Sequence, residues 1–124
     1  LLPVSAPFHC ALMQPAADAM AKALADVTIK APAAPLVCNV LASPITDPAE
    51  IRRRLVEQVT GTVRWRESVA YMAGHGVTRF FEVGAGKVLS GLVKRIAEGA
   101  VGVSVGGPGD IAAAKEALAA AKSA

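Results

Sequence analysis

The apolar residues of this chain alternate between two spacings, one typical of helices and the other of strands. Between Ala11 and Asp26 they recur at the helical period, which predicts a helix with one buried face. Asp47-Pro48-Ala49-Glu50 is close to a capping box, with proline at the first helical position, and it predicts a helix over 51–59. The face expected to be buried in the first helix comprises Leu12, Ala16, Ala19, Met20, Ala23 and Leu24.

Three further helices are predicted in the second half of the chain. One runs from Val63 to Ala73, and a second follows Gly84-Ala85-Gly86 and ends near Ile96. Asp110 is expected to cap a third, final helix. The positions expected to face inward are Val69 and Met72 in the first, Val88, Leu89, Leu92, Val93 and Ile96 in the second, and Ile111, Ala114 and Leu118 in the third.

Short apolar runs between these helices predict three strands, at 36–40, 77–83 and 101–105. Helices and strands that alternate with short connections are typical of the α/β class, in which helices cover a parallel sheet. Parallel strands are buried on both faces and need neighbours at both edges. We therefore expect these strands to form one end of a larger sheet whose other strands lie upstream.

Composition narrows the class of protein. The chain has 124 residues, 53% of them hydrophobic and 19% charged, which excludes disorder and predicts one packed domain or part of one. No apolar run approaches the ~18–20 residues of a membrane span, so we expect a soluble protein with no membrane partner. The chain begins at Leu1 without a secretory signal pattern, and it is expected to be part of a longer protein.

Charge and cysteine content exclude further classes. A net charge of +3 with only 4% aromatic residues argues against a nucleic-acid partner. Cys10 and Cys38 lack the spacing of metal ligands, so no metal site is expected. Two cysteines are also too few for a disulfide framework, which favours a reduced, cytoplasmic compartment.

His9 is the first candidate for chemistry. It lies in a proline-rich loop that leads into a helix, and a histidine held in this way suits a general base because positioning contributes much of the advantage of proton transfer. The alternative is a histidine that only packs against the helix start. Cys10 is a poor nucleophile for a Cys/His pair, because adjacent residues rarely point their side chains at each other.

Other polar motifs have simpler interpretations. Gly84-Ala85-Gly86-Lys87 lies where a phosphate-binding turn would, but it lacks the third glycine of a dinucleotide fingerprint and the Ser/Thr of a P-loop, which favours an ordinary tight turn. His75 lies between two glycines and is expected to be solvated. Arg52-Arg53-Arg54 is expected to be an exposed face of its helix.

Several separated segments together resemble one enzyme family. The segment around His9 resembles the surroundings of the active-site histidine in malonyl-CoA:acyl carrier protein transacylases. The resemblance runs from Leu2 to about Ile96, and its motifs occur in the order found in that family. These are Pro3 to Met13 with Pro15-Ala16-Ala17, Leu36 to Val40, Trp65, Ser68-Val69, Tyr71-Met72, Phe81 to Gly84, Gly86 to Leu89, Gly91-Leu92 and Lys94 to Ile96.

The resemblance implies a fold and a mechanism. The family has an α/β-hydrolase-like core with a small inserted subdomain, and its nucleophile is a serine in a G-H-S-x-G elbow. His9 matches the histidine that takes the serine proton while malonyl leaves coenzyme A for the enzyme, before its transfer to the phosphopantetheine thiol of acyl carrier protein. A backbone carbonyl at the position of Gln58 orients that histidine. Phe8 would lie near the acyl group, and Lys94 and Arg95 would contact the acidic carrier protein. The alternative for this Lys-Arg pair is that it only complements the helix dipole.

No G-H-S-x-G motif occurs in this chain. We therefore expect residues 1–124 to be the C-terminal part of the large acyltransferase subdomain, to need the N-terminal part of the enzyme as a partner, and to be inactive alone. No cofactor is expected. An acyltransferase domain of a polyketide synthase remains an alternative, as does a non-catalytic α/β binding module in which His9 is only a cap and Gly84 to Lys87 only a turn.

Overall fold

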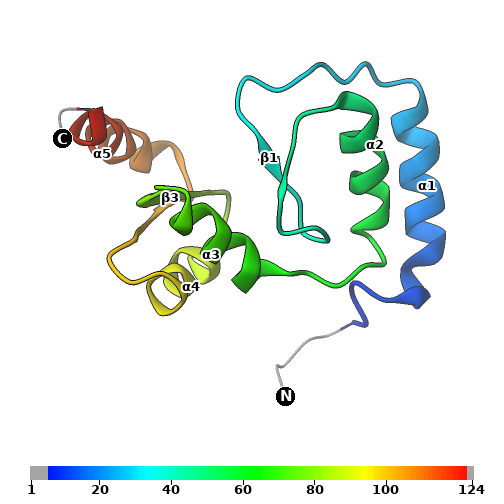
Figure 1. Ribbon diagram of the computed structural model, residues 1–124, viewed down its shortest axis with the longest axis horizontal. Helices are drawn as coiled ribbons and strands as arrows, with labels where there is room; N and C mark the ends of the chain where they lie inside the picture. The colour runs from blue at the N-terminus through cyan, green and yellow to red at the C-terminus, as the bar shows by residue number, and fades with distance from the viewer. Residues whose placement is uncertain (1–5, 123–124) are drawn as a thin grey trace. The chain divides into compact units, whose positions relative to one another are not determined.

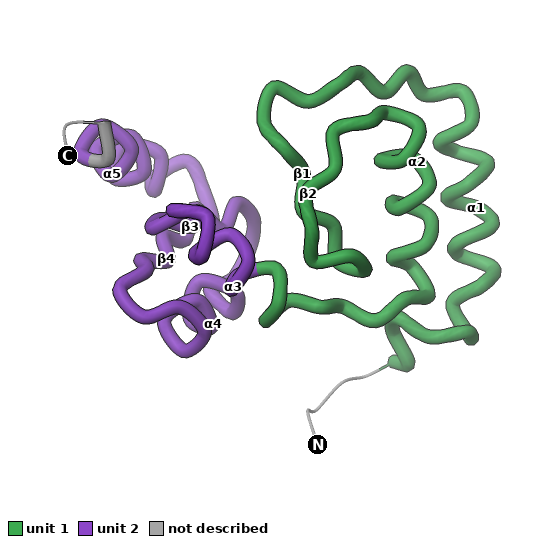
Figure 2. The backbone as a smooth tube through the Cα atoms, in the orientation of Figure 1, with its two compact units in different colours: residues 1–68 green, residues 69–124 purple. Residues whose placement is uncertain are grey.

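The computed structural model describes residues 6–122, which fold as helices and short strands that alternate only in the second half of the chain (Figure 1). The chain divides into two compact units, residues 1–68 and residues 69–124 (Figure 2). The α/β class predicted from the sequence is confirmed. The first unit carries His9 and Gln58, and the second carries Lys94 and Arg95.

The first unit pairs two helices with a small antiparallel sheet. A 3-10 turn, η1 (Ala11–Met13), leads into α1 (Gln14–Ala25), which packs against α2 (Pro48–Glu57). Strand β1 (Leu36–Val37) pairs with β2 (Pro44–Ile45). The buried core is small and consists of Cys38, Ile45 and Ile51, with Ile29, Leu36, Val40, Leu41 and Leu55 packed around it.

The expected parallel strand over 36–40 is wrong. Only Leu36 and Val37 are extended, and they pair antiparallel with Ile45 and Pro44. The amide of Ala42 donates to the carbonyl of Cys38 at 3.3 Å, and Ala42 itself takes a left-handed φ of 53°, so the chain reverses here and pairs with itself. An apolar run of this length does not by itself reveal the orientation of a strand.

The capping motif before α2 is confirmed. The carboxylate of Asp47 accepts a hydrogen bond from the amide of Glu50 at 2.8 Å, and Pro48 occupies the first helical position. The helix therefore begins at Pro48, earlier than the sequence pattern indicated, and it ends at Glu57. Gln58 is its C-terminal cap.

The expected buried face of α1 is wrong in detail. Leu12 is 75% exposed and Met20 is 40% exposed, whereas Ala17 is buried. The first turn is a 3-10 turn rather than α-helix, which moves Leu12 away from the face that the period of 3.6 predicts. Ala17, Ala21 and Leu24 share one side of the helix, and Ala21 lines a shallow groove together with residues of α2.

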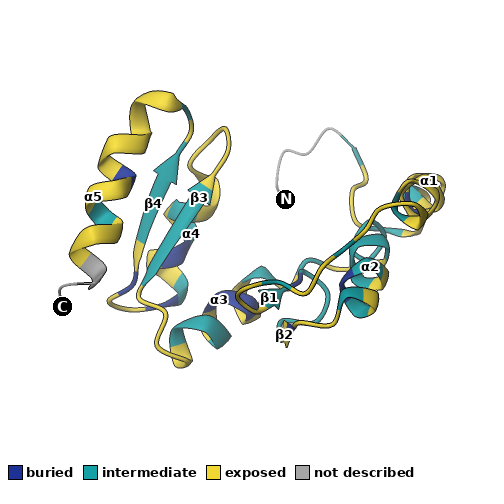
Figure 3. Ribbon diagram, turned by 90° about the horizontal axis from the view of Figure 1, so that it is seen from above, coloured by how far each residue is buried: buried dark blue, intermediate teal, exposed yellow. Residues whose placement is uncertain are grey.

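The second unit is built on two parallel strands, as expected. Strand β3 (Arg79–Val83) pairs in parallel with β4 (Val101–Val105), from Arg79 opposite Val101 to Val83 opposite Val105. Helix α4 (Val88–Ile96) joins the two strands and packs against both, and α5 (Ile111–Lys122) packs against β4 (Figure 3). The remaining helix, α3 (Trp65–Gly74), precedes β3 and spans the boundary between the units, since residues 65–68 belong to the first, and it buries Val69 completely.

Gly102 lets α4 lie directly on β4. A Cβ atom at this position would lie 2.4 Å from the carbonyl oxygen and 2.9 Å from the Cα of Ser90, which is closer than real atoms approach. Both neighbours are backbone atoms and cannot rotate away. A glycine is therefore required where the helix crosses the strand.

The final helix differs from the prediction both in the role of Asp110 and in which residues are buried. Asp110 ends a 3-10 turn (Pro108–Asp110), and its carboxylate accepts hydrogen bonds from the amides of Gly106 at 2.9 Å and Gly107 at 3.2 Å, so it caps the preceding turn. Of the three residues expected to face inward, only Ala114 is buried, whereas Ile111 and Leu118 are about half exposed.

Candidate active site

His9 lies in a tight turn just before η1. The amide of Phe8 donates to the carbonyl of Ala6 at 3.0 Å, and the thiol of Cys10 donates to the carbonyl of Pro7 at 3.2 Å. This contact directs the cysteine sulfur back along the loop. The backbone of His9 takes a left-handed φ of 56°, which costs a residue with a Cβ atom about 1–2 kcal/mol. Strain of this kind is concentrated at functional sites.

The imidazole of His9 is anchored by the backbone of Gln58. Its Nδ1 atom lies 2.9 Å from the Gln58 carbonyl oxygen. A carbonyl oxygen only accepts hydrogen bonds, so Nδ1 carries the proton and Nε2 keeps its lone pair in the neutral ring. This is the contact that the family resemblance predicts. The ring is thereby left with one nitrogen able to accept a proton from another group.

The position of Gln58 adds an electrostatic effect. As the C-terminal cap of α2, it lies at the end of the helix where the backbone carbonyls carry a partial negative charge. A cation is stabilised at such an end.

The candidate phosphate-binding turn has a different role. The carboxylate of Glu82, at the end of β3, accepts hydrogen bonds from the amide of Ser90 at 2.8 Å and of Leu89 at 3.2 Å. These first-turn amides of α4 are the groups that an anion would otherwise bind. The hydrogen bond from the Ser90 amide lowers the pKa of Glu82. The sequence 84–87 is therefore a turn whose helix is capped from within the chain.

The other predicted site residues are exposed. Phe8 is 58% exposed and adjoins His9 in the chain. Lys94 and Arg95 lie in the last turn of α4 with exposed side chains. They belong to the second unit, whereas His9 and Gln58 belong to the first. The structure thus brings together one predicted pair, His9 and Gln58.

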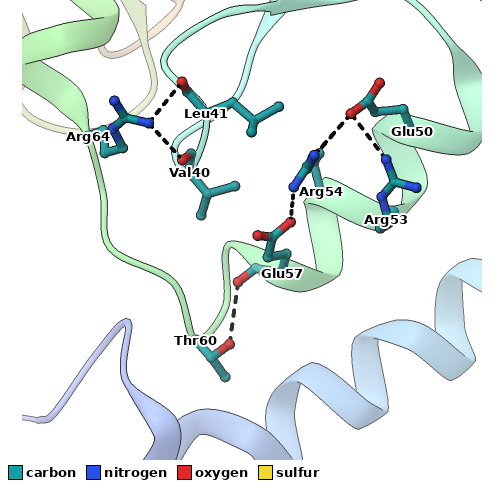
Figure 4. A network of polar contacts seen from close by, with 8 residues as sticks. All are labelled: Val40, Leu41, Glu50, Arg53, Arg54, Glu57, Thr60 and Arg64. Atoms are coloured by element: carbon teal, nitrogen blue, oxygen red, sulfur yellow. Dashed lines mark hydrogen bonds and ion pairs between the residues drawn. The ribbon is translucent and has the colours of Figure 1, made fainter.

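The three arginines of α2 are not a uniform exposed face, which corrects the sequence prediction. Arg54 is half-buried and contacts Glu50 and Glu57, and Arg53 forms an ion pair with Glu50 (Figure 4). Arg52 donates to the carbonyl of Val27 at 2.6 Å. Hydrogen bonding to Glu57 raises the pKa of Arg54 above its usual value. The spacing of three and four residues between these charges could have revealed the network from the sequence.

His75 is exposed, as expected, but it is also bound. Its Nδ1 lies 2.8 Å from the Tyr71 carbonyl oxygen, and its ring stacks on the Tyr71 ring with 4.0 Å between the centroids. The expectation of a simply solvated side chain was therefore incomplete.

Within residues 6–122, no cluster of three or more His, Cys, Asp or Glu side chains is arranged to hold a metal ion. No helix in the same range has the length and apolar character needed to cross a membrane.

Comparison with known proteins places the chain in a family. It is 49% identical to the malonyl CoA-acyl carrier protein transacylase of Escherichia coli K12 over 115 residues, which are 93% of this chain and 37% of that protein. The acyl-carrier-protein-S-malonyltransferase of Bartonella henselae superposes with a TM-score of 0.84 at 51% identity, covering 95% of this chain and 38% of that one.

A third match comes from a complex. A malonyl-transacylase solved with a type II polyketide synthase acyl-carrier protein superposes with a TM-score of 0.80 at 39% identity, over 93% of this chain and 37% of that one. No family model matches the chain. The chain spans a little over a third of the length of the relatives it matches. It belongs to the malonyl-CoA:acyl carrier protein transacylase family and corresponds to a C-terminal part of those proteins.

Proposed function

We propose that this chain is the base-bearing part of a malonyl-CoA:acyl carrier protein S-malonyltransferase of fatty-acid synthesis. The observation that carries this proposal is the 2.9 Å contact between His9 Nδ1 and the Gln58 carbonyl oxygen. It leaves Nε2 as a proton acceptor on a ring fixed in one orientation. The name of the Escherichia coli relative gives malonyl CoA and acyl carrier protein as its substrates, and the Bartonella henselae relative is named as an acyl-carrier-protein-S-malonyltransferase.

The proposed reaction has two halves. In each half, His9 accepts a proton from the attacking group and then donates it to the leaving group. In the first half, Nε2 takes the hydroxyl proton of a serine as its oxygen attacks the thioester carbonyl of malonyl-CoA. The carbon–sulfur bond breaks, and the departing thiol takes the proton back from the imidazolium. In the second half, the carrier's thiol gives its proton to Nε2 and attacks the malonyl-serine ester, and the serine oxygen leaves with that proton.

Gln58 acts through its main chain in this proposal. A carbonyl at a helix C-terminus holds the ring in one orientation, the orienting role that an aspartate has in a serine-protease triad. The nucleophilic serine would come from the N-terminal part of the same enzyme, since residues 1–124 contain no G-H-S-x-G elbow. We infer that residues 1–124 form the C-terminal part of the large acyltransferase subdomain and are inactive alone.

Two further roles belong to the same proposal. Lys94 and Arg95 would dock the acidic carrier protein, because their exposed charges lie together on the last turn of α4. Phe8 would fill space near the acyl group because it directly precedes His9. The compartment is proposed to be the cytoplasm, on the grounds of cysteine usage alone.

A polyketide pathway is the second candidate for the destination of the malonyl group. The transacylase solved with a type II polyketide synthase carrier protein is the specific observation that favours it. The chemistry at His9 would be the same in both cases. Only the carrier protein that accepts malonyl would differ.

The function can be tested with a chimera. The chain would replace the matching segment of the Escherichia coli transacylase, to which it is 49% identical, so that the upstream part supplies the serine. We expect malonyl transfer from malonyl-CoA to acyl carrier protein by the chimera, and none by residues 1–124 alone. A folded chimera that binds malonyl-CoA but forms no malonyl-enzyme ester would contradict the proposal.

A further inference from the structure

The last turn of α2 is held by a side-chain ion pair and by turn hydrogen bonds in addition to those of the helix. Helix ends fray, because their last carbonyls lack partners within the helix. In this chain such a carbonyl, that of Gln58, holds the imidazole of His9. The position of the ring therefore depends on how firmly this helix end is fixed.

Arg54 joins the beginning of α2 to its end. Its Nε and Nη2 atoms donate to Oε1 of Glu50 at 3.3 and 3.2 Å, and its Nη1 donates to Oε2 of Glu57 at 2.5 Å (Figure 4). Glu50 is itself fixed, because its amide is bound by the carboxylate of Asp47. We call the three side chains of Glu50, Arg54 and Glu57 the α2 clamp.

The α2 clamp acts on the residue that directly precedes Gln58. The side chain of Glu57 is bound by Arg54, and its carbonyl accepts hydrogen bonds from the amides of Gly61 at 3.0 Å and Thr60 at 3.3 Å. The amide of Gln58 donates in turn to the carbonyl of Arg54 at 3.0 Å. These bonds hold the peptide group between Glu57 and Gln58, and the next peptide group, which contains the Gln58 carbonyl, is held by the amide of Val59, which donates to the carbonyl of Val56 at 3.1 Å.

Within the clamp, Arg54 is sheltered from solvent and Glu57 is exposed, and the neighbouring Arg53 is more exposed than either. The side chain of Arg54 is 20% exposed and lines a pocket of about 290 Å³ together with Gln58. Arg53, one residue earlier, is 65% exposed and contacts Glu50 alone. Ion pairs with an exposed partner contribute little to stability. The effect of the clamp is therefore expected in the geometry of the site more than in the stability of the fold.

We propose that Arg54 is a positioning residue for the acyl transfer, which acts by fixing the Gln58 carbonyl and through it the imidazole of His9. This inference rests on the proposed function. Arg54 does not touch the reacting atoms. A planar guanidinium suits the task because its fork binds two carboxylates at once, whereas a lysine ammonium is a single point of charge.

The test uses the complete transacylase containing this chain, with kcat and KM for malonyl-CoA measured for Arg54→Ala, Arg54→Lys and the matched control Arg53→Ala. Misplacement of a catalytic group by about 1 Å costs up to about 100-fold in rate. We expect Arg54→Ala to lower kcat by about 10- to 100-fold with KM nearly unchanged. Arg54→Lys should recover part of the lost kcat. The kcat of Arg53→Ala should stay within about twofold of the wild-type value. If Arg53→Ala and Arg54→Ala lost equal activity, the inference would be wrong.

A double-mutant cycle separates positioning from a general structural effect. In a His9→Ala background, Arg54→Ala should lower the residual rate by less than about twofold, because the group it positions is gone. Independent, multiplicative losses would overturn the inference while leaving His9 as the base. Normal activity of His9→Ala itself would instead overturn the proposed function. If Arg54→Ala does not fold, Glu57→Gln is the deciding variant, because it weakens one of the two contacts that Arg54 makes. A wild-type kcat for Glu57→Gln would refute the inference. A loss of kcat without a change in KM would support it.

Discussion

The imidazole of His9 and the carbonyl of Gln58 meet at 2.9 Å although 49 residues separate them in the chain. The contact joins a loop whose backbone is strained at His9 to the C-terminal end of α2. The strained turn sets the direction of the ring, and the carbonyl selects the tautomer with a free Nε2. Together they give His9 a fixed position and an open lone pair, which the proposed general base requires.

A substitution at Gly61 tests how closely the turn after α2 is packed. A Cβ atom at this position would lie 2.6 Å from Cγ1 of Val40 and 3.1 Å from the carbonyl oxygen of Glu57. Gly61→Ala should therefore lower the free energy of unfolding by about 1–3 kcal/mol and reduce kcat, because Glu57 directly precedes Gln58. Gly74→Ala is the control, since nothing lies within 4 Å of its added carbon and it ends α3. Equal melting temperatures for Gly61→Ala and the wild type would refute the close packing.

The hydrogen-bonded carboxylate of Glu82 is expected to make a pH-dependent contribution to the stability of the fold. Hydrogen bonds from the Ser90 and Leu89 amides hold its carboxylate ionised, so its pKa in the folded protein is lower than the ordinary value of 4.5. The stability from this cap is complete above the unfolded pKa, and it is lost as the pH falls through the lower folded pKa. Glu82→Gln should therefore lower the melting temperature at pH 7, and the difference from wild type should shrink under acidic conditions.

The control for Glu82 is Glu116→Gln, which removes an exposed carboxylate from α5. Thermal melts of the complete enzyme across the acidic range measure both variants. A Glu82→Gln difference that stayed constant down to the lowest pH would mean that the carboxylate charge does not cap α4.

Lys94 and Arg95 are predicted to speed the encounter with the carrier protein. Attraction between exposed charges acts over a Debye length of ~8 Å at physiological salt and mainly affects association. Reversing both residues to Glu should raise KM for the carrier and flatten its salt dependence, while acylation by malonyl-CoA stays nearly unchanged. Reversing Lys22 and Lys30 in the first unit is the control. Equal losses in both half-reactions would indicate damage to α4 instead of lost docking.

The elements with local signals were predicted best. The capped start of α2, the helix over 88–96 and the strand over 101–105 follow from turn residues and periodicity, and the structure contains them. The antiparallel pairing of β1 with β2 was missed because an apolar run does not carry the direction of its neighbour. The faces of α1 and α5 were misjudged because a 3-10 turn precedes each helix, and because small alanines provide their buried positions.

The site was predicted unevenly. His9 stood out from its proline-rich loop, but no spacing rule connects it to a main-chain carbonyl 49 residues away, and only the family resemblance named Gln58. Any residue type could supply that carbonyl, so the sequence holds no chemical signal for it. Arg54 was overlooked for the opposite reason, because its glutamate partners at helical spacing resemble ordinary surface ion pairs.

The acylation rate of His9 variants tests the central claim most directly. In the complete transacylase, a rapid-mixing experiment would follow formation of the malonyl-enzyme ester for wild type, His9→Ala and His9→Asn. Asparagine tolerates a left-handed backbone, so it preserves the turn while removing the base. We predict that both variants slow acylation by ~10²–10⁴-fold with little change in melting temperature. Near-normal acylation in either folded variant would show that His9 is not the base.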